Sequence, residues 1–402
     1  MGTPLQVIKA KCQEVFEYVP DDSLLPEIIA CAMVAVMHPE FVVPLWFFVL
    51  GPPSSGKTES AKALEDYGHT LWYDEITCDS LVSAYVDSND PTKDFSLLPT
   101  WQKKLIVWKD ASSISGKSKI ELVRLFGILR AAFDGSYAKG SGTRGMISHK
   151  AYFGMLLLGT PWFDIFLDKF QQLGSRCLTF RISRLDTTFA EEIALAEKGR
   201  TAANTLNAKR EDLKNVVQGA INRTESYIKK HPQFPALTKE QGRVVDMLAA
   251  LLCRIRTAPL DDEMVTETEK PMRVSIQLQT LGHCRAFLDE RAAWNEEELD
   301  IIRRVVLDSL STRQRRLITV LYGDETGTTG PHMRLPRDGK VLMQVAQVPE
   351  NKQEMILKQM VASRLVEINE KTGYYQMTIA VWQAIKITGL LSQKNLPTKA
   401  IV

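Results

Sequence analysis

The 402-residue sequence predicts an α/β protein built on a doubly wound parallel β-sheet, followed by a helical region and a small C-terminal module. Three observations lead to this prediction. Apolar runs of strand length recur in the first half of the chain, helix-forming segments separate them, and from about residue 187 to 310 alanine and charged residues recur with helical spacing. Strands that alternate with helices form parallel sheets covered by helices on both faces.

The first predicted strand is Leu45 to Leu50, a continuous apolar run that ends at a glycine and is typical of a strand buried on both faces. Four further strands are predicted at Thr70–Tyr73, Leu105–Trp108, Tyr152–Leu158 and Cys177–Ile182. Helices are predicted from Glu59 to Tyr67, before a terminating Gly68, and from Ile120 to Phe133.

The change of pattern along the chain predicts five segments. These are an N-terminal helical segment (1–44), an α/β core (45–186), a helical region (187–310), a C-terminal module (311–385) and a tail (386–402). Within the module, Gly323 to Lys340 reads as an exposed loop, and helical stretches are expected at Val341–Val348 and Gln353–Ile368. A tight turn is expected at Glu370 to Gly373.

Composition restricts the class of protein. The hydrophobic content of 45%, the charged content of 24% and the net charge of +2 are ordinary for a soluble globular protein, so any nucleic-acid surface must be a local patch. Six cysteines without C-x-x-C spacing fit reduced thiols and predict no zinc site. No secretory signal is seen, and the apolar stretch Ile28 to Met37 is too short to span a membrane. We therefore expect a cytoplasmic protein without a membrane segment.

The segment after the first strand carries the strongest motif in the chain. Its residues match G-x-x-x-x-G-K-[ST] completely and are Gly51, Pro52, Pro53, Ser54, Ser55, Gly56, Lys57 and Thr58. The glycines let backbone N–H groups point at phosphates, Lys57 reaches the β- and γ-phosphates, and the Thr58 hydroxyl is a ligand for Mg²⁺. The sequence therefore predicts a site for ATP with Mg²⁺.

A phosphate-binding loop of this kind needs a carboxylate from a neighbouring strand to help hold the magnesium ion. Asp74 and Asp110 each follow a predicted strand. In P-loop ATPases of the additional-strand type, the strand near the magnesium ion comes after an intervening strand and helix, so we favour Asp110 over Asp74. Asp110 is followed by Ala111 and not by a glutamate, so Glu75 is the available candidate for the residue that activates water.

The order of these motifs resembles the AAA+ ATPases, in particular the minichromosome maintenance (MCM) branch and the ATPases encoded by bacteriophages and mobile elements. The resemblance covers roughly residues 45–380 as an order of motifs. It implies a P-loop AAA+ parallel sheet, a helical lid over 187–310 and a C-terminal winged-helix module. It assigns Thr160, where most AAA+ proteins have asparagine, to the sensor that detects the γ-phosphate.

The same resemblance suggests two catalytic arginines. Arg176 lies in a Ser-Arg segment similar to the one in which MCM-type proteins place the arginine finger, although the following Phe-Asp pair is absent and Arg181 and Arg184 compete for this role. Arg273 follows Pro271-Met272 at the start of a predicted helix that runs to Phe287, and it resembles the sensor-2 arginine of the lid.

DNA contacts are implied at two places. MCM-type helicases carry a β-hairpin between the strand of the magnesium carboxylate and the sensor strand, and here that interval contains Lys139, Arg144 and Lys150 among glycines, with Tyr137 as a possible stacking ring. The C-terminal module resembles a winged helix with Asn351 to Ile368 as its recognition helix. Its candidate phosphate contacts are Lys352, Lys358 and Arg364.

Together, the motifs and the resemblance predict a DNA-dependent AAA+ ATPase. We expect it to form a ring, with six subunits, and to act as a helicase or translocase in the DNA replication of a phage or mobile element. Single-stranded DNA would pass through the channel, and duplex DNA would contact the winged helix. Two other functions fit the same motifs: an ATP-switched initiator or helicase loader, and a protein-remodelling ATPase of the MoxR type. A small-molecule P-loop kinase fits less well, because it would need neither the C-terminal module nor the arginine finger.

Overall fold

The computed structural model of the chain describes residues 2–16, 24–90, 93–111, 114, 116–142, 145–161, 176–182, 189–202, 204–256, 269–322, 337–348 and 350–392. The chain divides into two compact units. The first comprises Met1–Phe163, Gln172–Ala236 and Thr280–Trp294, and the second is built mainly from Leu237–Gln279 and Asn295–Val402. Each unit is described separately below.

The first unit contains a five-stranded parallel sheet with the strand order β2-β3-β6-β1-β7. The strands are β1 (Trp46–Leu50), β2 (Thr70–Tyr73), β3 (Leu105–Trp108), β6 (Gly154–Gly159) and β7 (Leu178–Arg181). Every residue of β1, β3, β6 and β7 is buried, because these strands are covered on both faces. The predicted parallel α/β sheet is thereby confirmed, and all five predicted strands occur within two residues of their predicted ends.

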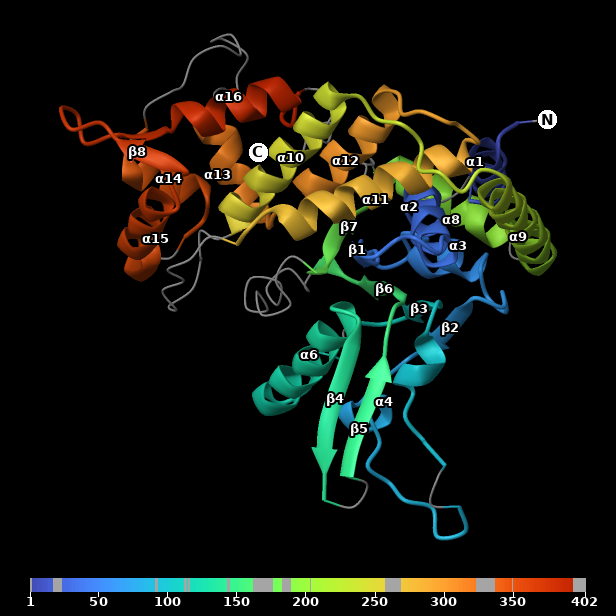
Figure 1. The fold of residues 1–402 in the computed structure, drawn as a ribbon. Helices are drawn as coiled ribbons and strands as arrows, with labels where there is room; N and C mark the ends of the chain where they lie inside the picture. The colour runs from blue at the N-terminus through green and yellow to red at the C-terminus, as the bar shows by residue number, and fades with distance from the viewer. Residues whose placement is uncertain are drawn as a thin grey trace. The chain divides into compact units, whose positions relative to one another are not determined.

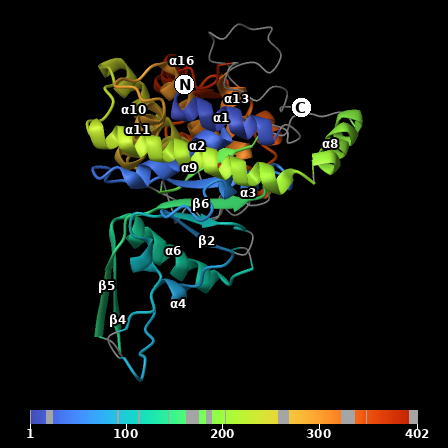
Figure 2. The same ribbon diagram turned by 90° about the vertical axis from the view of Figure 1, so that its right-hand side faces the viewer.

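Helices cover both faces of this sheet (Figures 1 and 2). Helix α2 (Leu25–Met37) packs on β6 and β3 beside α3 (Lys57–Lys62), whereas α4 (Cys78–Leu81) and α6 (Lys119–Phe133) lie on the other face. Helix α2 is almost entirely buried, which explains its unbroken apolar sequence. The short helix η1 (Leu98–Trp101) precedes β3.

A two-stranded hairpin lies between α6 and β6 in the chain. Its strands β4 (Ser136–Ser141) and β5 (Gly145–Lys150) pair antiparallel, with Ser136 opposite Lys150 and Ser141 opposite Gly145. Figures 1 and 2 both show the hairpin extending away from the five-stranded sheet. A hairpin in this interval is what the resemblance to MCM helicases led us to expect.

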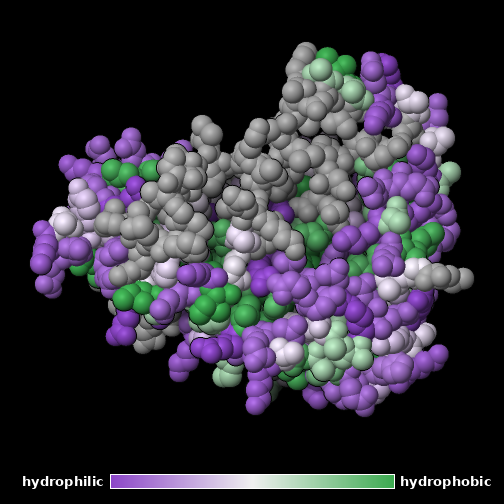
Figure 3. Space-filling model, turned by 90° about the horizontal axis from the view of Figure 1, so that it is seen from above, coloured by the Kyte–Doolittle hydropathy of each residue, from purple (hydrophilic) through white to green (hydrophobic). Residues whose placement is uncertain are grey.

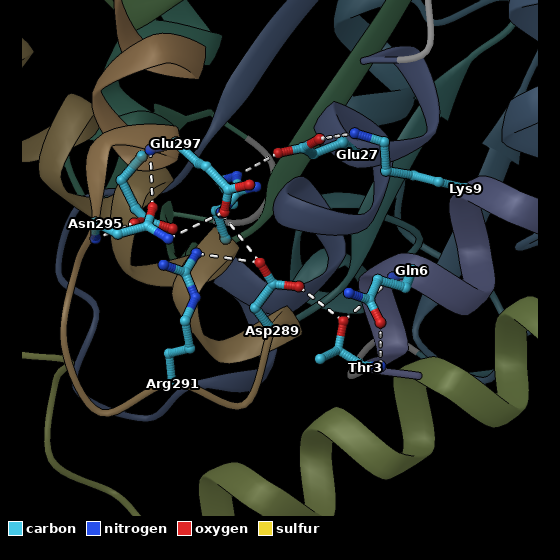
Figure 4. Close-up of polar contacts among 10 residues, drawn as sticks. Thr3, Gln6, Lys9, Glu27, Asp289, Arg291, Asn295 and Glu297 are labelled. Atoms are coloured by element: carbon cyan, nitrogen blue, oxygen red, sulfur yellow. Dashed lines mark hydrogen bonds and ion pairs between the residues drawn. The ribbon is translucent and has the colours of Figure 1, made fainter. Parts of the chain in front are cut away.

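Long helices complete the first unit. Helix α1 (Pro4–Val15) packs along α9 (Leu206–Lys230), which follows α8 (Phe189–Ala202). Helix α11 (Met272–Leu288) enters this unit at Thr280, where the buried Arg285 pairs with the buried Glu27 at 2.6 Å. Figure 4 shows Lys9 on the other oxygen of Glu27, and Asp289 bridging Thr3 and Arg291. These charged contacts join α1, α2 and α11 into one body.

Within its described residues, the second unit is helical apart from one small hairpin. It contains α10 (Lys239–Arg256), α12 (Glu296–Asp308), α13 (Thr312–Tyr322), α14 (Gly339–Val345), α15 (Glu350–Ala362) and α16 (Ile379–Thr388). Strands β8 (Val366–Ile368) and β9 (Tyr375–Met377) pair antiparallel between α15 and α16. Arg337 forms a further bridge with Tyr375, so a short third segment joins the hairpin.

Several boundaries differ from those predicted, and α14 covers Gly339–Val345 where Val341–Val348 was expected. Helix α3 ends at Lys62 and not at Tyr67, because Asp66 takes a positive φ of 59° and the Thr70 hydroxyl donates to the carbonyls of Leu64 and Tyr67. Helix α15 ends at Ala362, so the expected helix up to Ile368 is wrong: Val366–Ile368 is strand β8. The predicted boundary at residue 385 falls inside α16.

The predicted segments also do not coincide with the two units. The N-terminal helices belong to the unit of the sheet, and the region 187–310 is divided between both units. Most of the predicted loop Gly323 to Lys340 lies outside the described residues, and α14 begins within its end.

In the described part of the chain, no helix is both long and apolar enough to cross a membrane. On the face seen in Figure 3, hydrophobic residues occur in small groups between hydrophilic ones.

Candidate functional site

The loop Gly51–Thr58 connects the carboxyl end of β1 to the start of α3, and two of its glycines are required by geometry. Gly56 has a φ of 79°, a left-handed conformation that glycine adopts without strain, and it directly precedes the first helical residue, Lys57. A methyl group on Gly51 would lie 2.8 Å from the Ser55 hydroxyl and 3.0 Å from Ile182. The loop is therefore tightly curled, as a backbone that surrounds a phosphate must be.

The ammonium group of Lys57 lies over this loop. Its Nζ donates to the carbonyl oxygens of Gly51 and Pro52, both at 2.7 Å, and to the Ser55 hydroxyl at 3.2 Å. Burial lowers the pKa of Lys57, and the negative charge of Asp110 opposes this effect. The loop thus holds a half-buried cation at the start of α3, where the partial positive charge of the helix N-terminus adds to an environment suitable for an anion.

Asp110 is the carboxylate that the fold brings to this lysine. It follows β3, which is separated from β1 only by β6, whereas Asp74 and Glu75 follow the edge strand β2. Asp74 forms an ion pair with Lys109 at 3.1 Å, and Glu75 pairs with Lys117 at 2.9 Å; both carboxylates are largely exposed. The geometry favours Asp110 over Asp74 beside the loop.

The residues present fit a magnesium ion bound together with a nucleotide. The described residues contain no cluster of three or more His, Cys, Asp or Glu side chains that could hold a metal ion alone. A P-loop needs no such cluster, because phosphates, waters, one hydroxyl and one carboxylate complete the oxygen shell of Mg²⁺. Thr58, in the first turn of α3, and the exposed Asp110 would supply the two protein oxygens.

Thr160 lies at the carboxyl ends of the strands, as the loop Gly51–Thr58 and Asp110 do. It directly follows β6, the strand between β1 and β3. The amide of Gly51 donates to the carbonyl of Gly159 at 3.1 Å, and the amide of Ala111 donates to the carbonyl of Leu158 at 2.8 Å. The end of β6 is therefore bonded to the phosphate loop on one side and to the Asp110 segment on the other, with Thr160 half-buried next to both.

Arg176 lies at the amino ends of the strands, opposite the carboxyl ends where the loop Gly51–Thr58 begins. It precedes β7, in which Leu178 pairs with Phe47 of β1. Phe47 is four residues before Gly51, so the start of β7 is about 13 Å from Gly51 along the strand direction. Its guanidinium donates to the Asp134 carboxylate at 2.6 Å and lies 5.9 Å from the centre of the Phe133 ring. Arg176 is therefore turned away from the phosphate loop of its own chain.

The other arginine candidates have different surroundings. Arg181 is the last residue of β7, beside Leu50, and its side chain is buried. Arg184 lies outside the described residues. Arg273 is the second residue of α11, as expected, and is half-buried; it belongs to the second unit, whereas the loop Gly51–Thr58 belongs to the first.

The hairpin residues proposed for DNA do not share one surface. Lys139 pairs with Ile147, and Lys150 pairs with Ser136. Since side chains alternate along a strand, Lys139 and Lys150 project from opposite faces of the hairpin. The face of Lys139 contains the buried Ile147, and the face of Lys150 is the exposed one. Arg144 lies outside the described residues.

The same face of the hairpin as Lys139 meets the segment before η1. His149 Nε2 lies 3.4 Å from an oxygen of Asp94. Tyr137 is opposite His149 and half-buried, so its ring is less available for stacking than an exposed tip residue such as Met146, which is 82% exposed.

The three C-terminal residues proposed to contact DNA, Lys352, Lys358 and Arg364, do not all lie on one helix. Lys358 is exposed on α15 and pairs with Glu354 at 2.7 Å. Lys352 belongs to α15, but its side chain lies outside the described residues. Arg364 is not on the helix: it has a positive φ of 56°, and the amide of Leu365 donates to the carbonyl of Met360, a hydrogen-bond pattern that ends a helix. The expectation that Arg364 lies on the recognition helix is wrong.

One polar contact of the site had no signal in the sequence. Asp134, the partner of Arg176, lies 42 positions away in the chain, and only the packing of α6 against the start of β7 brings the two together. Comparison of the sequence with models of known protein families gave no match, and no related protein was found among curated proteins.

Proposed function

We propose that the chain is a DNA-dependent AAA+ ATPase, similar in motif order to MCM helicases, that acts as a ring-shaped motor on DNA. The observation that carries this proposal is the tightly curled loop Gly51–Thr58 with the Lys57 ammonium over it and the Asp110 charge beside it. This arrangement provides backbone donors, one cation and one carboxylate for a nucleoside triphosphate with its magnesium ion.

Each residue then has a defined task. The backbone of residues 51–57 orients the phosphates, and Lys57 neutralises charge on the β- and γ-phosphates. Thr58 and Asp110 would hold Mg²⁺, which would supply positive charge to the phosphate oxygens. Thr160, bonded through its strand to both loops, positions the γ-phosphate or the attacking water. Glu75 is the proposed base; it follows β2 at the carboxyl end of the sheet and pairs with Lys117 at 2.9 Å.

The strand order supports the AAA+ assignment. A further strand, β6, lies between the phosphate-loop strand β1 and the Asp110 strand β3, as in P-loop ATPases of the additional-strand type. The hairpin β4–β5, which directly precedes β6 in the chain, matches the arrangement in MCM-type proteins. In the second unit, helices α13, α14 and α15 followed by the β8–β9 hairpin are compatible with a winged helix.

The position of Arg176 supports a ring. Arg176 lies at the amino ends of the strands and Gly51 at their carboxyl ends. Arg176 can therefore act as an arginine finger only on the nucleotide of a neighbouring subunit. Heterologous contacts of this kind close into rings when the rotation between copies permits. We propose a homo-hexamer with ATP bound between subunits.

The first experiment measures ATP hydrolysis with and without single-stranded DNA, together with strand displacement on a forked duplex. Stimulation by DNA with unwinding is expected. ATP-dependent DNA binding without unwinding would favour an initiator or loader instead, and no response to DNA would favour a protein-remodelling ATPase.

The second experiment tests the shared site. Subunits carrying Arg176→Ala are mixed with subunits carrying Lys57→Ala, each inactive alone. Partial recovery of hydrolysis is expected, because mixed rings contain some sites with both an intact loop and an intact finger. Absence of any recovery in rings shown to be mixed would contradict a composite site. Asp134→Ala, which removes the partner of Arg176 but not the guanidinium, serves as the control.

A further inference from the structure

A cluster of arginines surrounds the junction of α12 and α13 in the second unit. Arg304 Nε donates to Asp308 at 2.8 Å, Arg315 Nη1 lies 3.7 Å from the other oxygen of Asp308, and Arg256 Nε donates to the carbonyl of Ser309 at 3.3 Å. These three guanidinium groups thus converge on two consecutive residues. We call this cluster, together with Arg313 and Arg316, the junction patch.

Arg313 and Arg316 extend the junction patch along α13. Gln314 is buried and donates to the carbonyl of Ile255, so this side of α13 faces α10. With 100° between successive helical residues, Arg316 points to the opposite side, and Arg313 and Arg315 flank it. All three arginines are half-exposed. Within the described residues, the side chains of Arg313 and Arg316 have no hydrogen bond or ion pair.

Among the described residues, the junction patch has an excess of positive charge. Its five arginines are accompanied by Asp308, which is only 2% exposed, and by Glu269, whose charge acts with that of Arg256 on buried Cys253. Neighbouring Arg303 is not part of the patch, because Glu296 and Asp300 pair with it.

The position of the charge is unfavourable for the helix. The first turn of α13 has no acidic residue and contains two arginines, although the partial positive charge of a helix N-terminus favours carboxylates. Local charge that conflicts with helix stability is expected mainly where it serves binding. In the described structure, no side-chain hydrogen bond or ion pair occupies the guanidinium groups of Arg313 and Arg316, so both can donate to a ligand.

We propose that the junction patch binds the phosphate backbone of duplex DNA. This proposal rests on the proposed function and names a contact surface for it in the second unit. Arginines on three helices, without an exposed aromatic ring among them, suit phosphates held in the fixed geometry of a duplex, whereas single strands are bound on stacking platforms. Helices α13 and α15 line one small apolar cavity through Leu317, Ile318, Ile356 and Met360, so the patch has a fixed relation to exposed Lys358.

The test compares duplex binding by the full chain and by the double variant Arg313→Gln/Arg316→Gln, measured by fluorescence anisotropy from 50 to 300 mM salt. Each lost phosphate contact lowers the slope of log K against log salt by about 0.9, so the slope is expected to fall by about 2 and the affinity roughly 10- to 30-fold at 0.15 M salt. The control Lys229→Gln/Lys230→Gln removes the same charge from the end of α9 and is expected to leave the slope unchanged.

Thermal melting of both variants checks that they are folded. Arg313→Gln/Arg316→Gln is expected to melt at or slightly above the wild-type temperature, because it removes a positive charge from the first turn of α13. If a folded Arg313→Gln/Arg316→Gln variant binds duplex DNA with the wild-type slope, the junction patch is not the contact surface. If the wild-type chain binds single-stranded but not duplex DNA, this inference is wrong and the proposed motor stands. If it binds neither, the DNA part of the proposed function is wrong as well.

Discussion

Gly282 on α11 provides a sharp test of the packing in the first unit. A methyl group added there would lie 2.3 Å from Cη2 and 2.4 Å from Cζ2 of Trp294, far inside van der Waals contact. Trp294 cannot move freely, because its amide donates to the carbonyl of Ala236 and its indole Nε1 donates to His283 Nδ1 at 3.1 Å. The substitution Gly282→Ala therefore displaces a held, buried indole.

The expected destabilisation follows from two opposing effects. Overpacking a tight interior costs about 1–3 kcal/mol, and losing the indole hydrogen bond costs about 1 kcal/mol more. Replacing glycine by alanine within a helix returns at most about 1 kcal/mol. The net loss is about 1–3 kcal/mol, which corresponds to a fall in Tm of roughly 2–10 °C for a unit of this size.

The matched control is Gly219→Ala on α9. Gly219 is also inside a helix, but a methyl group there meets no atom within 4 Å. Thermal unfolding followed by tryptophan fluorescence and circular dichroism should show Gly219→Ala unchanged or slightly more stable and Gly282→Ala less stable. Equal stability of the two variants would refute the close packing of α11 against Trp294.

Three further predictions concern the site and the cores. Asp110→Asn should weaken Mg²⁺-dependent nucleotide binding by about 10- to 100-fold, whereas Asp74→Asn should change it little; the reverse result in a nucleotide titration would exchange their roles. Burial lowers the pKa of His283 to about 4 from an unfolded value near 6.5, so this residue contributes about 3 kcal/mol of stability that is present above pH 6.5 and is lost as the pH falls toward 4. Urea unfolding between pH 7.5 and 4 should show this loss, and His283→Gln should reduce it; an equal pH dependence in both proteins would contradict it. Lys150→Gln should lower the salt dependence of single-stranded DNA binding by about 0.7 per phosphate contact and Lys139→Gln by less, because only Lys150 lies on the exposed face of the hairpin; equal effects would argue against this difference.

The sheet could be predicted because each of its strands is marked within its own residues. Runs such as Leu105–Trp108 are apolar throughout, and only a strand covered on both faces buries every side chain of such a run. The loop Gly51–Thr58 could be predicted equally well, since its glycines and lysine lie close together in the sequence.

Features that depend on tertiary contacts were not predictable in this way. Helix α3 stops at Lys62 although the residues that follow favour a helix, because Thr70 captures two carbonyls of the next turn. Arg364 ends α15 in a left-handed conformation that no local pattern announces. The preference for Asp110 over Asp74 came from the order of strands along the chain, and the sheet order, which places only β6 between β1 and β3, is consistent with it.

The central claim is that Lys57, held over the loop Gly51–Thr58, binds the phosphates of ATP. Calorimetric titration of MgATP into the wild-type chain and into Lys57→Ala tests this most directly. The wild-type chain should bind MgATP at one site per chain, and Lys57→Ala, if folded, should lose binding by at least an order of magnitude. Wild-type affinity in a folded Lys57→Ala variant, or no binding by the wild-type chain, would contradict the assignment.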